Sequence, residues 1–217
     1  NLRALADFQH SDTYIKVVWG PEVDDASEVE KLATLPGIMT VATVRYLESK
    51  GVDPEGVELV TSSPPDVPVM LERGDVDGTV IYEPWATRSA EESGGEIVGT
   101  IGDFDVNYAQ WLISDSEWLD DHEDDAANVL AALKDANDFI RDNPEEAQQI
   151  VEDAIKMPKD QTAQIMDELI FETRDIDEAA LKSSKETAEF FVESGDMKSM
   201  PELDKQILTG WLTDHLE

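Results

Sequence analysis

The stretch Gly74-Asp75-Val76-Asp77-Gly78-Thr79-Val80-Ile81-Tyr82-Glu83-Pro84-Trp85 decides the fold of this chain. Gly74 ends a helical pattern, and the four residues that follow it have the composition of a turn. The β-branched and aromatic run 79–82 predicts a buried strand, which Pro84 ends because proline cannot donate to a sheet ladder. Three side chains therefore lie at the carboxyl end of a strand, where open α/β sheets bind ligands: Tyr82, Glu83 and Trp85.

Strands and helices alternate on both sides of this stretch. Strands are predicted at 15–19, 31–35, 57–61 and 96–101, and helices at 38–50, from residue 66 onward and at 85–93. This order is typical of a largely parallel sheet with helices on its faces.

After residue 103 the pattern changes. One more strand is predicted at 108–113, and then only helices, at 120–142, 145–156, 160–173, 177–194 and 201–216. We expect an α/β lobe at 25–103, and a second part formed by 1–24 and 104–217 in which helices pack on an incomplete sheet.

The chain is strongly acidic. It has 50 Asp and Glu against 16 Lys and Arg, a formal net charge of −34. Such a surface repels nucleic acid and anionic membranes, so no nucleic-acid partner is expected. The acidic residues are spread among apolar ones, which indicates a halophilic protein whose self-repulsion is screened by salt. The alternative is an ordinary acidic protein.

The sequence lacks the residues or motifs that several kinds of chemistry require. The chain has no cysteine, so disulfides and thiol catalysis are excluded. The three histidines, His10, His122 and His215, do not have the spacing of a metal site. No phosphate loop, dinucleotide turn or nucleophile elbow occurs, and no apolar run reaches membrane-spanning length. We predict no metal and no cofactor.

Three further features suggest a binding site. The segment Thr34–Thr40 places backbone N–H groups and a hydroxyl at a helix N-terminus, which suits an anionic or polar ligand. A plain strand-to-helix turn is the alternative. His10, in a polar segment predicted to be a loop, is a candidate to line a pocket. Aromatic residues gather where strands end, either as core edges or as walls of a ligand cage: Trp19, Tyr82, Trp85, Tyr108 and Trp111.

Three segments, taken together, resemble one protein family. They are Gly51-Val52-Asp53-Pro54-Glu55-Gly56-Val57-Glu58-Leu59-Val60, the segment from Pro65 to Trp85, and Asn143-Pro144-Glu145-Glu146-Ala147. They are similar to segments of the solute-binding proteins of nitrate, sulfonate and taurine ABC importers and of the related thiamine-precursor class. The resemblance implies an α/β fold of the type II periplasmic-binding-protein kind, with two lobes and a hinge near 19–24 and 103–108.

The resemblance covers most of the chain but not the front of the family. The N-terminal part of lobe one is expected to be absent, and a chain that begins at Asn1 is expected to be processed or a fragment. The implied function is that of an extracellular, cell-surface-associated component of an ABC importer. It captures a small sulfonate, nitrate, taurine or pyrimidine-like solute as a monomer, without catalysis, and delivers it to permease and ATPase subunits.

The expected ligand-binding residues are His10, Pro36, Gly37, Met39, Thr40, Ser63, Tyr82, Glu83, Trp85 and Asn107. Arg88 is the nearest basic residue to Glu83 in the sequence, so we expect the Glu83 carboxylate to face the ligand and to favour a solute with donor groups. Two alternatives remain. A thiamine-precursor enzyme would need a cysteine-rich motif, and the effector-binding domain of a transcription regulator would need a basic DNA-binding segment.

Overall fold

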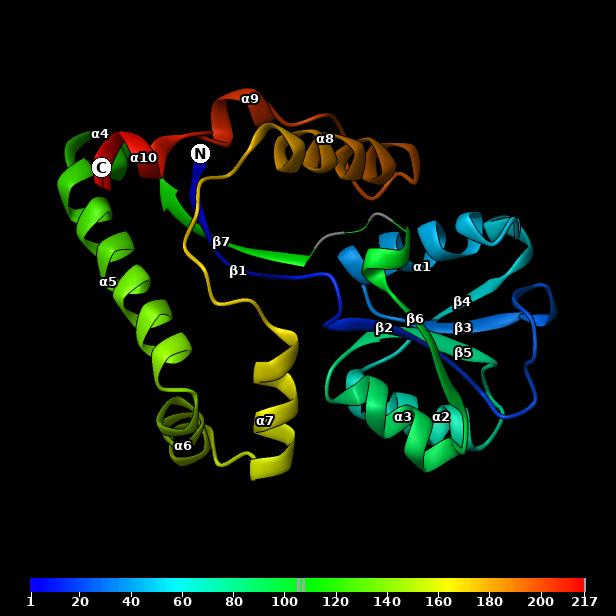
Figure 1. Ribbon diagram of the computed structural model, residues 1–217. Coiled ribbons are helices and arrows are strands. Elements are labelled where there is room, and N and C mark those ends of the chain that lie inside the picture. The colour runs from blue at the N-terminus through cyan, green and yellow to red at the C-terminus, as the bar shows by residue number, and fades with distance from the viewer. Residues whose placement is uncertain (105, 107, 217) are drawn as a thin grey trace. The chain divides into compact units, whose positions relative to one another are not determined.

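The motif 74–85 contributes the middle strand of a five-stranded sheet (Figure 1). The computed structural model describes residues 1–104, 106 and 108–216. The strand order is β4 (Glu58–Thr61), β3 (Lys31–Thr34), β5 (Gly78–Tyr82), β2 (Ile15–Trp19) and β6 (Glu96–Thr100). Strand β3 is parallel to β4 and β5, whereas β2 is antiparallel to both β5 and β6. The predicted, largely parallel sheet is confirmed, with one antiparallel strand inserted in it.

The helices of this sheet begin and end at the predicted turn residues. Gly74 follows α2 (Val67–Glu72) with φ of 69°, and its N–H donates to the Leu71 carbonyl at 3.1 Å. Gly37 precedes α1 (Ile38–Ser49) with φ of 87°. Glycine adopts this left-handed region without the strain that a side chain would cause. The third helix, α3, spans Trp85–Ser93 as predicted.

Each face of the sheet is covered by its own apolar cluster. Neighbouring residues of one strand belong to different clusters, because successive side chains point to opposite faces. Val17 packs with Tyr46 and Leu47 of α1, whereas Val18 packs with residues of α2 and α3. Figure 1 shows α1 on one side of the sheet and α2 and α3 on the other. Burial on both faces explains the nearly continuous apolar runs of these strands.

The chain divides into two compact units. The five-stranded unit comprises 11–108 and 160–169, and the helical unit comprises 1–10, 109–159 and the residues from 170 onward. From the sequence, residues 1–24 were expected to lie outside the α/β lobe. In the structure, β2 lies within that range and belongs to the five-stranded sheet, because its backbone pairs with β5 and β6. Helix α7 (Lys159–Glu168) joins the same unit although it is distant in sequence.

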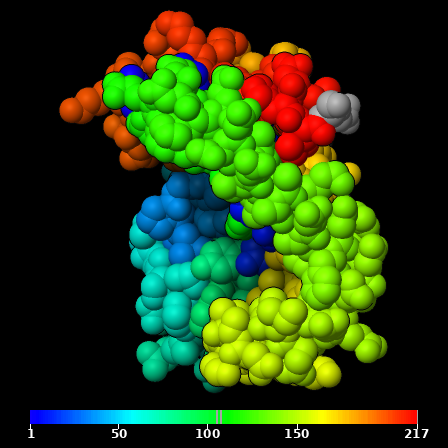
Figure 2. Space-filling model, turned by 90° about the vertical axis from the view of Figure 1, so that its left-hand side faces the viewer, coloured from blue at the N-terminus to red at the C-terminus, as the bar shows by residue number. Residues whose placement is uncertain are grey.

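The helical unit has a sheet of two strands, β1 (Leu2–Ser11) and β7 (Tyr108–Asp115). Its helices are α4 (Ser116–Asp121), α5 (Glu123–Asp142), α6 (Pro144–Ile155), α8 (Glu178–Glu193), α9 (Leu203–Gln206) and α10 (Trp211–Leu216). Leu5, Leu119, Leu130 and Trp211 form one of its cores. Figure 2 shows α5 and α6, green to yellow-green, along one face of this unit. Short 3₁₀ helices lie elsewhere, at Ala26–Glu28, Pro54–Gly56, Pro64–Asp66 and Ile101–Phe104.

Several predicted elements, most of them in the helical unit, differ from the structure. The segment of His10, predicted to be a loop, is part of β1, whose His10 pairs with Ile170. This pairing also ends α7 at Glu168, short of the predicted residue 173. The predicted helix 201–216 is two helices, because Ile207 leaves the helix to pair with Ala4. The predicted helix 120–142 is likewise interrupted, at His122.

Within the residues that the structure describes, we find no helix with the length and apolar character needed to cross a bilayer.

Candidate ligand-binding site

The carboxyl edge of the five-stranded sheet gathers most of the expected binding residues. Because β3, β4 and β5 run in parallel, Thr34, Thr61 and Tyr82 all end at this edge. The turn after β4 is tied to the end of β3, since the Ser62 N–H donates to the Thr34 carbonyl at 3.0 Å. The structure thus brings the segments of Pro36–Thr40, Ser63 and Tyr82–Trp85 to one edge.

The turn after β3 presents the amino end of α1. Pro36 and Gly37 are exposed, and Gly37 provides no side-chain cap. The Thr40 hydroxyl donates to the Leu35 carbonyl at 3.1 Å, which holds the turn. The Met39 side chain is 5% exposed and belongs to the core, so it is not offered to a ligand. The first N–H groups of a helix have no intrahelical acceptor, and the helix dipole favours an anion there.

Three tyrosines meet at the same edge. The ring of Tyr14 stacks on that of Tyr82 with 5.9 Å between centroids, and it lies 5.1 Å from the ring of Tyr108. Burial raises the pKa of Tyr14 above its usual value, and the neighbouring Tyr108, Tyr82 and Glu83 add to this, so its hydroxyl stays neutral.

Tyr14 was not among the binding residues expected from the sequence. It precedes β2, and β2 is antiparallel to β5, so the Tyr14 carbonyl accepts the Glu83 N–H at 3.0 Å. An antiparallel partner begins where the parallel strands end. Because the sequence does not show which strands pair, only this register places Tyr14 at the carboxyl edge of the parallel strands.

The Glu83 side chain points into the protein. Its carboxylate is fully buried and lies 3.0 Å from Lys16 Nζ. It also accepts hydrogen bonds from the Thr87 hydroxyl at 2.9 Å and the Thr87 N–H at 3.1 Å. Arg88 pairs instead with Glu92 at 2.8 Å. The structure therefore does not show the free carboxylate that we expected Glu83 to offer to a ligand, because Lys16 and Thr87 already hold it.

Lys16 is the cation of this buried network. Its side chain is 13% exposed, and its ammonium lies 3.0 Å from Glu83 and 2.5 Å from Glu168 of α7. Burial lowers the pKa of Lys16, but the hydrogen bonds to Glu168 and Glu83 outweigh that effect and place it above its usual value. Lys16 and Glu168 are 152 positions apart, so no local pattern could have indicated the pair.

The remaining expected residues have separate surroundings. The exposed Ser63 hydroxyl donates to Asp66 at 2.5 Å. Trp85 is half-buried, packs against the cluster beneath α2 and α3, and has the Arg88 guanidinium 4.9 Å from its ring centre. His10 belongs to the helical unit, with Asp7 at 3.6 Å and Glu172 at 3.9 Å. Asn107 lies outside the described residues.

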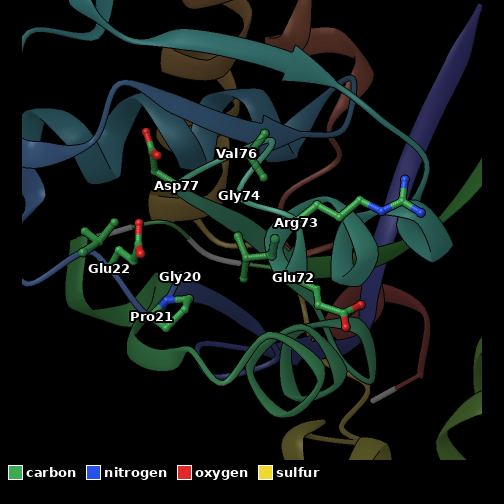
Figure 3. Close-up of a pocket in the computed structure, with 10 residues that line it drawn as sticks. Gly20, Pro21, Glu22, Glu72, Arg73, Gly74, Val76 and Asp77 are labelled. Carbon is green, nitrogen blue, oxygen red and sulfur yellow. The ribbon is translucent and has the colours of Figure 1, made fainter.

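A hollow of about 230 Å³ lies at the other edge of the sheet (Figure 3). It is lined by the segment 20–23, after β2, by the last two residues of α2 and by the segment between α2 and β5. In Figure 3 the Arg73 side chain extends away from Gly20 and Pro21, so it does not converge with them on the hollow. In the described part of the chain, no group of three His, Asp or Glu side chains could hold a metal ion.

Comparison with known proteins identifies the family of this chain. The model of the NMT1-like family matches residues 23–155, which is more than half of the chain. The chain belongs to the NMT1-like family. A search of curated proteins by sequence found no match for this NMT1-like protein. The resemblance found in the sequence is therefore confirmed by the family match.

Solved structures share the fold of this NMT1-like protein. The periplasmic aliphatic sulphonate-binding protein SsuA from Escherichia coli matches with a TM-score of 0.85 and 13% identity, over 98% of this chain and 75% of that one. The alkanesulfonate-binding protein SsuA from Xanthomonas axonopodis pv. citri, bound to MOPS, matches with a TM-score of 0.75 and 11% identity, over 95% of this chain and 73% of that one. The desulfurization enzyme DszB matches with a TM-score of 0.69 and 15% identity, over 99% of this chain and 79% of that one.

These likenesses confirm the predicted α/β fold of the periplasmic-binding-protein kind. Because the identities are low and both binding proteins and an enzyme share the fold, function has to be argued from the site.

Proposed function

We propose that this NMT1-like protein is the extracytoplasmic solute-binding component of an ABC importer and that it binds a small organic oxyanion, such as an alkanesulfonate. One observation carries the proposal: the uncapped amino end of α1 and the tyrosines Tyr14, Tyr82 and Tyr108 lie at the same edge of one sheet. Backbone N–H groups suit the oxyanion, and the aromatic rings suit a carbon chain.

The proposed solute differs from the one expected from Glu83 alone. The Glu83 carboxylate is already bound by Lys16 and Thr87, so the ligand does not need a cationic end to pair with it. The likeness in fold to an alkanesulfonate-binding protein bound to MOPS, itself a sulfonic acid, supports this class. Nitrate has no carbon chain to contact the rings and should bind more weakly than a sulfonate.

Binding without catalysis fits the groups at this edge. Backbone N–H groups, hydroxyls and aromatic rings hydrogen-bond and pack against a solute, and they supply no covalent chemistry. The protein acts as a monomer, outside the cytoplasm at the cell surface, and passes the solute to a permease with an ATPase subunit. Loss of labelled sulfonate uptake after deletion of the gene would test that role, and unchanged uptake would oppose it.

Titration calorimetry in molar KCl tests the solute class. The probes are butanesulfonate, taurine, nitrate and an aminopyrimidine. We expect butanesulfonate to bind most tightly, and Tyr82→Ala to weaken it by about 3- to 10-fold, the value of one aromatic contact. Tyr82→Phe, which keeps the ring, is the matched control and should bind like the unchanged protein. Tighter binding of nitrate or of the aminopyrimidine would oppose the proposal.

A further inference from the structure

The Lys16 ammonium has two carboxylate partners in different surroundings. Glu83 is fully buried and is also held by Thr87. Glu168 lies at the last position of α7, and its side chain is 21% exposed. Glu83 is therefore a fixed partner of Lys16, whereas Glu168 reaches it from a helix at the surface.

Polar contacts hold α7 on the five-stranded unit. Gln164 donates to the Thr87 hydroxyl at 2.5 Å, and the Ser11 hydroxyl donates to the Glu168 carbonyl at 2.5 Å. The Glu168 carboxylate adds the contact to Lys16 at 2.5 Å. Thr162 is the one side chain of this helix that is buried. A segment held by few apolar contacts opens at a lower free-energy cost than the core around it.

Lys16 lies close to the proposed ligand edge. It is the second residue of β2, next to Ile15, which pairs with Tyr82, and two positions after Tyr14. An anionic head group at this edge meets a chain with a formal charge of −34, and a helix dipole alone offsets little of that repulsion. The ammonium of Lys16 is the charge that suits such a head group.

We propose that the Glu168 carboxylate occupies the place of the ligand's anionic group, and that a solute oxyanion displaces this carboxylate and binds Lys16 instead. This inference rests on the proposed function. The exchange leaves Lys16 with two anionic partners and the three groups with one net negative charge, so it favours a singly charged head group such as a sulfonate over sulfate. Solute binding then releases the contact of α7 with Lys16.

Calorimetry with butanesulfonate in molar KCl tests the exchange on Glu168→Gln and on Asp167→Asn. Both variants lose one negative charge, but the exposed Asp167 side chain makes no contact with Lys16 in the structure's described part. Glu168→Gln should bind about tenfold more tightly, because one partly buried ion pair no longer competes. Asp167→Asn should stay within about twofold of the unchanged protein.

A second variant and a second measurement complete the test. Lys16→Met combined with Glu83→Gln removes the cation without leaving the fully buried Glu83 carboxylate unpaired, and it should weaken butanesulfonate binding at least tenfold while the circular dichroism spectrum is retained. Hydrogen exchange of residues 160–168 should become faster when butanesulfonate is added to the unchanged protein.

The outcomes separate this inference from the proposed function. If the unchanged protein binds butanesulfonate but Glu168→Gln binds it equally or less tightly, the inference is overturned and the proposed function stands. Slower exchange of α7 on binding also overturns it. Binding by Glu168→Gln but not by the unchanged protein supports the exchange. If neither binds any of the probes, the proposed function and the inference both fail.

Discussion

Replacing Glu83 with alanine is expected to destabilise the protein rather than to change its ligand. The carboxylate is fully buried and accepts from Lys16 Nζ at 3.0 Å and from the hydroxyl and N–H of Thr87. Its removal leaves a largely buried ammonium with Glu168 and takes the acceptor from both Thr87 donors. Breaking a buried pair from one side costs about 3–5 kcal/mol of unfolding free energy. Because Glu168 remains, we expect about 3 kcal/mol.

Urea denaturation in molar KCl measures this loss in a double-mutant cycle. Lys16→Met leaves the Glu83 carboxylate buried without its cation, so it should cost a similar amount. The double variant removes both charges, and its loss should be about 1–3 kcal/mol smaller than the sum of the two single losses. Arg88→Met, which breaks the exposed pair with Glu92, is the control and should cost about 1 kcal/mol or less.

Two results would refute this reasoning. If the single losses of the Glu83 and Lys16 variants simply add, the two side chains do not interact as a buried pair. If Glu83→Ala leaves the unfolding free energy unchanged but weakens sulfonate binding, the carboxylate faces the ligand, as the sequence alone led us to expect.

Three other predictions concern salt, pH and Trp85. The melting temperature should rise from dilute buffer to molar KCl, because the screening length falls from about 30 Å at 0.01 M to about 3 Å at 1 M; a flat melting temperature would contradict a halophilic adaptation. The pKa values of Lys16 and Tyr14 are raised above their ordinary 10.5 and 10.0, so the stability they contribute is present below those values and is lost as pH rises through the folded-state pKa values. Urea denaturation should therefore show that the free energy of unfolding falls above about pH 10, and that it falls less in Lys16→Met than in the unchanged protein. An equal fall in the two proteins would oppose this. Trp85→Ala should lower the free energy of unfolding by about 2–3 kcal/mol, less than the loss of a fully buried aromatic residue, with little change in sulfonate affinity. Weaker sulfonate binding with an unchanged free energy of unfolding would place Trp85 against the ligand.

The sequence by itself determined the elements of the five-stranded unit. The helices and strands between residues 15 and 100 lie where turn residues and apolar runs predicted them. Glycine conformation, proline geometry and side-chain periodicity are local properties, so a single segment carries their information. The same local signals placed Tyr82 at a strand end and Pro36–Gly37 before a helix.

Pairing between distant segments was decided only in the tertiary structure. Strand β1 was missed because it forms by pairing with β7 and with the segment that contains Ile170, and the break between α9 and α10 has the same origin. Tyr14 reached the carboxyl edge of the parallel strands through the antiparallel register of β2, and Lys16 met Glu168 across 152 positions. The spacing of residues along a chain records the periodicity of one element, whereas the partner of a strand edge or of a buried charge depends on which other segment fills the space beside it.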